Sequence, residues 1–371
     1  MTTRFRPVLA RFLAACLALH ASAACAETPT PEPFMRGADI SALKTLEDDG
    51  AVYRHPDGTP GDALHVMTEQ GLNWYRLRLF VDPDGVGVVN NDLAYTTALA
   101  KRVKAAGGAF LLDFHYSDTW ADPGKQYKPK AWEDLSFEAL AAQVEAYTRE
   151  VVEHLDAAGA APDMVQIGNE ITAGMLWPDG RLWVEGEDQD AAFDRLAILL
   201  KAGMQGVRTA SIDAPTPKLM VHIARGDRWH ESEFFFTKLA ERDLDFDIIG
   251  YSYYPRFHGT VEELRDNFHR TAEAFQKPIV LVEFGFAYNG GEFEPNHEAF
   301  EYPVTIRGQS AFTRDVVRVV RETPNGLGKG VFWWHAAATP TDSGLAWEGG
   351  RLGLFDENGR ALPAMTTMGR N

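Results

Sequence analysis

The feature that most constrains the fold of this chain is a repeated alternation between short apolar runs and longer segments with helical spacing. Several of the runs are nearly continuous apolar stretches, which is typical of parallel strands buried on both faces. The eight runs cover residues 36–40, 74–80, 109–114, 164–167, 218–223, 246–251, 278–282 and 330–334. We therefore expect eight strands in one parallel sheet.

The segments between the runs predict helices. The clearest covers 136–158, where Ser136 is a candidate N-cap, apolar residues follow at helical spacing and Gly159 ends the pattern. Similar patterns cover 92–106, 193–209, 260–275 and 310–322. Strands that alternate with helices in this way predict a (β/α)8 TIM barrel, formed by residues 35–371 as a single domain. An open doubly wound sheet is the alternative, but no glycine-rich phosphate loop follows an early strand.

The first 26 residues have the pattern of a signal peptide. Three arginines precede a short apolar run at 12–19, and Ala24-Cys25-Ala26 fits the small-x-small cleavage pattern. We expect cleavage after Ala26, a linker over residues 27–34, and export to the periplasm or the cell exterior. The apolar run is too short to span a bilayer, and no other stretch reaches the roughly 20 apolar residues that a transmembrane helix needs.

Both cysteines, Cys16 and Cys25, lie in this leader, so the mature chain would have no disulfide, zinc-thiolate site or thiol nucleophile. Acylation of Cys25 in a lipoprotein is an alternative, but Ser22 stands where such signals usually carry an aliphatic residue. Removing the leader removes three arginines and no acid, so the formal charge of −17 becomes more negative by three. This charge argues against nucleic acid or an anionic membrane as a partner and suits a neutral polymer.

Two glutamates follow apolar runs at the end of the barrel where function is usually built. Glu170 comes just after the fourth run and Glu283 directly after the seventh. A pair of carboxyl groups is typical of the active site of a glycosidase. One protonates the leaving oxygen, and the other attacks the anomeric carbon or activates water. Asn169 is placed to bind the sugar 2-hydroxyl beside Glu170. The alternative is an ion pair at the barrel rim.

Aromatic and short polar side chains collect at other strand ends, as a sugar site requires. Arg76 and Arg78 alternate on the second run and share a face. We assign Arg78, nearer the strand end, to function, and leave Arg76 open between holding a carboxylate ionised and pairing with a helix. A metal cluster of Asp113, His115 and Asp118 is an alternative, but no ligand spacing supports it. The candidate sugar-binding residues from this pattern are Arg78, His115, Asp118, Trp120, Asn169, Trp177, Tyr254 and Trp334.

Together these motifs resemble glycoside hydrolase family 53, the endo-β-1,4-galactanases that cut type I arabinogalactan. The segments that carry the resemblance are 37–41, 113–123, 168–171 with 173–180, and 254–260, and the match runs from about Gly37 to Pro363. The loop at 113–123 reads Asp-Phe-His-Tyr-Ser-Asp-Thr-Trp-Ala-Asp-Pro and is nearly the signature loop of the family.

The resemblance implies a retaining enzyme with Glu170 as acid/base and Glu283 as nucleophile, their carboxyl groups ~5 Å apart. It further implies that Tyr254 holds the nucleophile, that Trp334 floors the subsite of the cleaved sugar, and that Asp39 belongs to the substrate site. The expected partners are β-1,4-galactan or arabinogalactan and galacto-oligosaccharides. We expect no required cofactor and a monomer.

Two departures from the family pattern are expected at the active-site rim. Glu283 is followed by Phe284-Gly285-Phe286 where the family usually has Thr-Ala-Tyr, and His335 follows Trp334 where the family usually has Glu. Because of these departures, the alternative function remains another retaining β-1,4-glycanase of the same clan, a mannanase or a glucanase. A galactan-binding barrel without catalysis is the alternative from another class, although such a protein has no need of both acids.

Bacterial members of the family often bind calcium in the loop after the seventh strand. Here Glu292, Glu294 and Asn296 offer oxygen ligands at the same alternate spacing, although the residues differ. A structural calcium ion is therefore a candidate, with a solvated acidic loop as the alternative.

Overall fold

The computed structural model describes residues 1–2, 33–290 and 301–370. Its contacts divide the chain into two units, Met1–Pro33 and Phe34–Asn371. Nearly all of the predicted signal peptide and linker lies outside the described residues, and both remain predictions. The predicted barrel falls in the second unit.

Eight parallel strands close into a barrel, which confirms the predicted fold class. Around the barrel the order is β1-β10-β9-β8-β7-β4-β3-β2, so each strand pairs with its neighbours in the chain and the last pairs with the first. The strands are β1 (Met35–Asp39), β2 (Trp74–Leu79), β3 (Ala109–Phe114), β4 (Met164–Ile167), β7 (Lys218–Ile223), β8 (Ile248–Tyr253), β9 (Ile279–Phe284) and β10 (Gly328–Trp333). Strands β5 (Gly174–Met175) and β6 (Gly180–Arg181) form a small separate hairpin.

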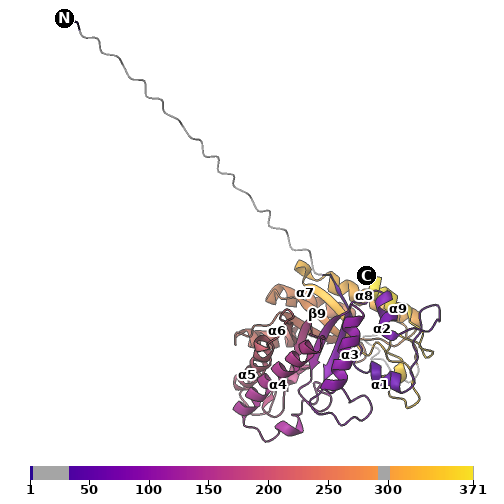
Figure 1. Ribbon diagram of the computed structural model, residues 1–371, viewed down its shortest axis with the longest axis horizontal. Helices are drawn as coiled ribbons and strands as arrows, with labels where there is room; N and C mark the ends of the chain where they lie inside the picture. The colour runs from indigo at the N-terminus through magenta and orange to yellow at the C-terminus, as the bar shows by residue number, and fades with distance from the viewer. Residues whose placement is uncertain (3–32, 291–300, 371) are drawn as a thin grey trace. The chain divides into compact units, whose positions relative to one another are not determined.

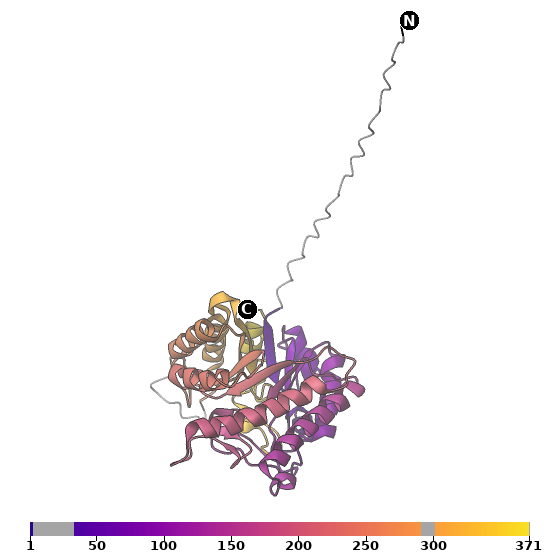
Figure 2. The ribbon, with the colours of Figure 1, turned by 90° about the vertical axis from the view of Figure 1, so that its left-hand side faces the viewer.

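Helices surround the strands, as Figures 1 and 2 show. The five predicted helices are present as α3 (Leu93–Ala105), α4 (Phe137–Ala157), α5 (Gln189–Thr209), α7 (Val261–Phe275) and α8 (Ile306–Arg321). Four more were not predicted: α1 (Leu43–Asp48), α2 (Ala63–Glu69), α6 (Trp229–Ala240) and α9 (Pro363–Arg370). Most of these four are too short for helical periodicity to stand out.

Local sequence explains where the helices begin. The Ser136 side chain accepts a hydrogen bond from the Ala139 N–H and caps α4 as predicted. At α7, Thr260 and Glu263 form a reciprocal capping box, which satisfies two backbone N–H groups that the helix leaves unpaired.

The sixth barrel strand lies two residues later than predicted, at Ile248–Tyr253. Tyr253 is therefore a buried strand residue and not a loop residue. The hydroxyls of Tyr251 and Tyr253 bond to Thr271 and to the Gly259 carbonyl. An apolar run shows that a strand exists, but pairing with β7 and β9 decides where it ends. Tyr254 then begins the loop at the carboxyl end.

The amino end of the barrel interior is apolar. Met35, Leu111, Met164, Met220 and Phe332 belong to one buried cluster there. Gly37 leaves room for the Phe332 ring, since a Cβ at this position would lie 2.2 Å from it. The polar side chains of the interior are thus left for the opposite end, where the strands terminate.

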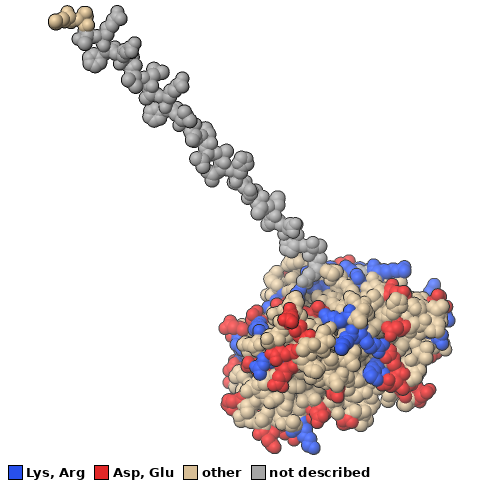
Figure 3. Space-filling view, in the orientation of Figure 1, with Lys and Arg blue, Asp and Glu red and all other residues tan. Residues whose placement is uncertain are grey.

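Charged side chains of both signs lie on the face seen in Figure 3, with red side chains beside the blue ones. Among residues 1–2, 33–290 and 301–370, no helix combines the length and apolar character needed to cross a bilayer.

The apolar cluster yields a stability prediction. Phe332→Ala should lower the free energy of unfolding by about 3–5 kcal/mol, because it leaves a cavity inside a barrel that cannot collapse around it. Urea denaturation measures the loss. Phe234→Ala on α6 is the control, since that ring is 41% exposed and should cost clearly less. A loss under about 1 kcal/mol for Phe332→Ala would show that the cluster does not support the barrel.

Candidate active site

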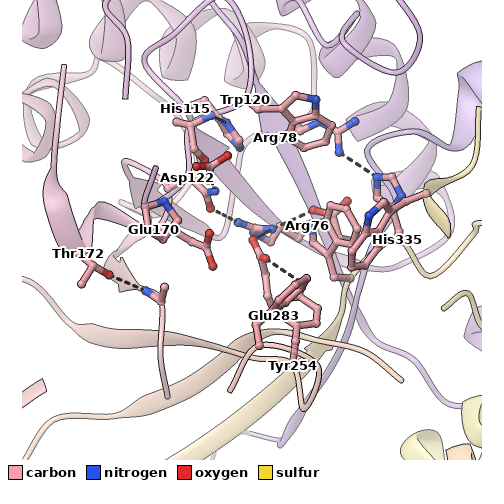
Figure 4. Close-up of a pocket in the computed structure, with 18 of the residues that line it drawn as sticks. Arg76, Arg78, His115, Trp120, Asp122, Glu170, Thr172, Tyr254, Glu283 and His335 are labelled. Carbon is pink, nitrogen blue, oxygen red and sulfur yellow. Dashed lines mark hydrogen bonds and ion pairs between the residues drawn. The ribbon is translucent and has the colours of Figure 1, made fainter. Parts of the chain in front are cut away.

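A cavity of about 790 Å³ opens at the carboxyl ends of the strands (Figure 4). Nine of the predicted site residues line it: Asp39, Arg78, His115, Trp120, Asn169, Glu170, Tyr254, Glu283 and Trp334. Asp118 and Trp177 are not among the lining residues. The barrel therefore brings together side chains that are far apart in the sequence.

Asp118 and Trp177 organise loops. The Asp118 carboxylate accepts hydrogen bonds from the backbone N–H groups of Asp82 and Lys130. The Trp177 indole donates to the Ala173 carbonyl, and its face packs against Arg181. Their predicted sugar contacts stay predictions.

The turn after β4 aims Glu170 into the cavity. Gly168 and Glu170 have φ angles of 80° and 46°, so the backbone turns sharply at the strand end. The Asn169 side chain fixes this turn: its Nδ2 donates to the Ala121 carbonyl at 2.8 Å, and its Oδ1 accepts from Arg76 at 2.8 Å. Strained backbone of this kind is common at functional sites.

Arg76 is fully buried, and all five N–H groups of its guanidinium have partners. Its terminal nitrogens contact Asp39 at 3.0 Å, Asp113 at 2.8 Å and Glu283 at 2.8 Å, besides Asn169. Its Nε donates to Gln166 Oε1 at 3.3 Å. The open alternatives for Arg76 are thereby resolved in favour of a carboxylate partner, because it pairs with barrel residues and not with a helix.

Glu283 lies within β9, one residue from its end. One carboxyl oxygen contacts Arg76, and the other accepts a hydrogen bond of 2.9 Å from the Tyr254 hydroxyl. Burial raises the pKa of Glu283 to about 7, while the charge of Arg76 opposes that rise. Both contacts favour the ionised form of this carboxyl.

Glu170 has no comparable cation. Burial, and next the negative charge of Glu283, raise its pKa to about 8. The two carboxyls face each other across the cavity in Figure 4. Since only Glu283 touches Arg76, Glu283 ionises first and Glu170 keeps its proton to higher pH.

Asp113 and His115 support this arrangement from β3 and the loop that follows. The Ala121 N–H donates to His115 Nδ1 at 3.0 Å, so His115 carries its proton on Nε2 and donates it to Asp113 at 3.1 Å. Asp113 in turn contacts Arg76. Both ring nitrogens of His115 are thus used by the protein, although the residue lines the cavity.

One wall of the cavity is aromatic. Trp334 lies 6.2 Å from Trp120, 6.4 Å from Tyr254 and 4.5 Å from Trp347, measured between ring centroids. The Arg78 guanidinium stacks over Trp120 at 4.2 Å. Flat faces beside charged hydrogen-bonding groups suit a sugar ring.

The two sequence departures lie in different places. His335 lines the cavity, stacks on Trp334 with centroids 3.9 Å apart and has Nε2 3.5 Å from Arg78. Phe284 and Phe286 instead pack against the buried Phe312 and do not line the cavity. The expectation that both departures alter the rim is therefore wrong for the phenylalanines, because their rings point into the layer between barrel and helices.

Several residues at this end were missed from the sequence: Asp113 as an Arg76 partner, His222, Ser252, Arg225 and Trp347. A signal existed for His222, which interrupts an otherwise apolar buried strand. Nothing in the sequence marked Trp347, since it lies in a long loop.

Within the described part of the chain, no group of three or more His, Cys, Asp or Glu side chains could hold a metal ion. The calcium candidates Glu292, Glu294 and Asn296 lie outside the described residues, and calcium stays a prediction.

A closed parallel barrel with two buried carboxyls in one cavity, one after β4 and one at the end of β9, defines a glycoside hydrolase of the barrel type. Residues 35–368 match glycosyl hydrolase family 53, and the chain belongs to that family.

Relatives and solved structures agree with this membership. An uncharacterized protein of Niallia circulans is 42% identical over 91% of this chain and 94% of its own length. A probable arabinogalactan endo-β-1,4-galactanase A of Aspergillus terreus is 37% identical over 82% of this chain and 86% of its own. The catalytic domain of the Ignisphaera aggregans family 53 enzyme superposes with a TM-score of 0.81 at 33% identity, covering 92% of this chain and 96% of that one.

The raised pKa of Glu170 predicts how stability depends on pH. Protonated Glu170 contributes stability that is fully present below the unfolded pKa of 4.5 and lost as the pH rises through about 8. Glu170→Gln stays neutral throughout. The variant should match the parent near pH 4.5 and be more stable by roughly 2–4 kcal/mol near pH 8.5. Urea denaturation at both pH values measures this, and a difference that does not change with pH would contradict the assignment.

Proposed function

We propose that this chain hydrolyses internal β-1,4-galactosidic bonds of galactan or type I arabinogalactan with retention of anomeric configuration. The observation that carries the proposal is the unequal pair of carboxyls in one aromatic-walled cavity, Glu283 paired with a cation and Glu170 not. Family membership and the galactanase relative supply the substrate class. Glu283 acts as nucleophile and Glu170 as acid/base.

In the first half of the reaction a Glu283 oxygen attacks the anomeric carbon. The glycosidic bond breaks, and the leaving oxygen takes the proton of Glu170. In the second half Glu170 removes a proton from water, the water oxygen attacks the anomeric carbon, and the Glu283 carboxylate is released. Arg76 and Tyr254 bind the two oxygens of Glu283 and keep it ionised before attack.

Sugar binding follows from the remaining lining residues. Trp334 offers a flat face beside the carboxyl pair, and Trp120 is fixed by the stacked Arg78. Asp39 stays ionised at this end: burial alone would raise its pKa, but the charges of Arg76 and Arg78 lower it below its ordinary value. Carboxylate and guanidinium groups provide charged hydrogen bonds for hydroxyls.

The same proposal includes export, with cleavage after Ala26, and a monomeric state. The sequence of residues 1–26 supports export. A neutral polymer too large to enter a cell has to be cut outside it, which agrees with a leader sequence. Calcium, if bound near 292–296, would be structural and outside the chemistry.

Activity on linear β-1,4-galactan tests the proposal. The chain without residues 1–26 should release reducing sugar, and Glu170→Ala and Glu283→Ala should each lower kcat by several orders of magnitude, roughly 10³–10⁵. Glu241→Ala, at an exposed acid directly after the carboxyl end of α6, is the matched control and should retain full activity.

Two results would overturn parts of this account. Hydrolysis of mannan or glucan with no action on galactan would leave the reaction type and remove the substrate assignment. Binding of galactan without turnover, unaffected by both glutamate substitutions, would identify a binding protein instead of an enzyme.

A further inference from the structure

The Glu170 carboxyl is held by two buried side chains that have no part in the bond changes of the reaction. The Ser252 hydroxyl on β8 is close enough to this carboxyl to lower its pKa. His222 on β7 has its Nε2 2.9 Å from Ser252 Oγ. Both are fully buried. The strands β4, β7 and β8 are neighbours in the barrel, so Glu170, His222 and Ser252 lie on adjacent strands or directly after one.

A local irregularity in the sheet places Ser252. The pairing of β8 with β9 shifts register between Tyr251 and Ser252, so that Ser252 lies opposite Glu283. Irregularities of this kind re-aim a side chain and are frequent next to active sites. The shift brings the Ser252 hydroxyl to the level of the carboxyl pair, where an alcohol can bond to Glu170.

The other ring nitrogen of His222 reaches the backbone of the same residue. Its Nδ1 lies 3.4 Å from the Glu170 backbone N–H, which donates to it. His222 therefore contacts Glu170 twice, directly at the main chain and through Ser252 at the carboxyl. Since Glu170 has a left-handed φ angle, a contact that fixes its backbone also fixes where its side chain points.

The surroundings define the charge and the proton of this imidazole. Burial lowers the pKa of His222 well below its ordinary value, and the nearby Arg76 and His115 lower it further, so the ring is neutral. Asn169 Oδ1, 3.1 Å from Nδ1, already accepts from Arg76. Nδ1 faces two donors, the Glu170 N–H at 3.4 Å and Gln166 Nε2 at 3.1 Å. The single ring proton therefore lies on Nε2 and donates to Ser252 Oγ. The Ser252 hydroxyl is then left to donate to Glu170.

We propose that His222 and Ser252 are positioning residues for the acid/base. The His222 N–H donates to Ser252, and the Ser252 O–H donates to the Glu170 carboxyl. The Ser252 hydroxyl thus holds one carboxyl oxygen and leaves the other for proton transfer. The ionised form that exists between the two halves of the reaction gains the Ser252 hydrogen bond. This inference rests on the proposed function, because it assigns roles relative to Glu170 as acid/base.

The charged groups that face Glu170 come from other elements: Glu283 on β9, Asp122 in the loop after β3, and Arg76 on β2. None of them is removed by a change at Ser252. A shift in the titration of Glu170 in a Ser252 variant therefore reports the lost hydroxyl.

Ser252→Ala tests the direction of the hydrogen bonds. It should lower kcat on galactan by about 10- to 100-fold with little change in KM, and move the alkaline limb of the kcat/KM profile to higher pH by up to about one unit. Ser232→Ala is the matched control: Ser232 is a buried serine on α6 that donates to the Arg228 carbonyl, so its loss should leave kcat and the limb unchanged. Ser252→Thr, which keeps a hydroxyl, should hold the limb near that of the parent.

A limb that stays in place or moves to lower pH in Ser252→Ala would overturn the proposal, because the hydroxyl would then not favour ionised Glu170. If Ser252→Ala does not fold, ¹⁵N chemical shifts of His222 in the unsubstituted protein decide the matter. They should show the proton on Nε2, and a proton on Nδ1 would reverse the hydrogen bonds and contradict the inference. This measurement needs no substrate, so a failed galactan assay would count against the substrate assignment alone.

Discussion

The guanidinium of Arg76 is the group around which the carboxyl end of the barrel is arranged. It brings three carboxylates from three strands, Asp39, Asp113 and Glu283, into contact with one cation. A buried cation with all its N–H groups satisfied can offset the desolvation of these acids, whereas an unpaired acid at this depth would take up a proton. The position of Glu283 and its charge therefore depend on the same residue.

The two glutamates differ because only one of them touches that cation. Glu283 has Arg76 and Tyr254 on its two oxygens, and Glu170 has the Ser252 hydroxyl. Two carboxyls in one cavity thus take different protonation states at neutral pH, as the proposed roles of one acid and one nucleophile require. Aromatic rings on the opposite wall add the apolar faces for a sugar but do not set these charges.

The sequence was sufficient for the barrel, because buried parallel strands leave nearly continuous apolar runs and acids at strand ends must meet at one face. It also placed Glu170, Glu283 and most of the other cavity-lining residues at this end of the barrel. It could not show that Arg76 rather than Arg78 contacts the carboxylates, since alternation places both on one face and depth decides between them. Asp118 and Trp177 were predicted from their motifs to contact sugar. In the structure their side chains form hydrogen bonds with the backbone of loops instead. Phe286 looked like a rim residue and is a core residue, because loop residues after a strand can turn back into the core.

The most direct test of the central claim is chemical identification of the nucleophile. A 2-deoxy-2-fluoro-β-galactoside with an activated leaving group should form a stable ester, since the fluorine slows the second half of the reaction. Peptide mass spectrometry should then locate the added galactosyl mass on Glu283. Labelling of Glu170, or no label together with an inverted product anomer by NMR, would contradict the account of two unequal carboxyls organised by Arg76.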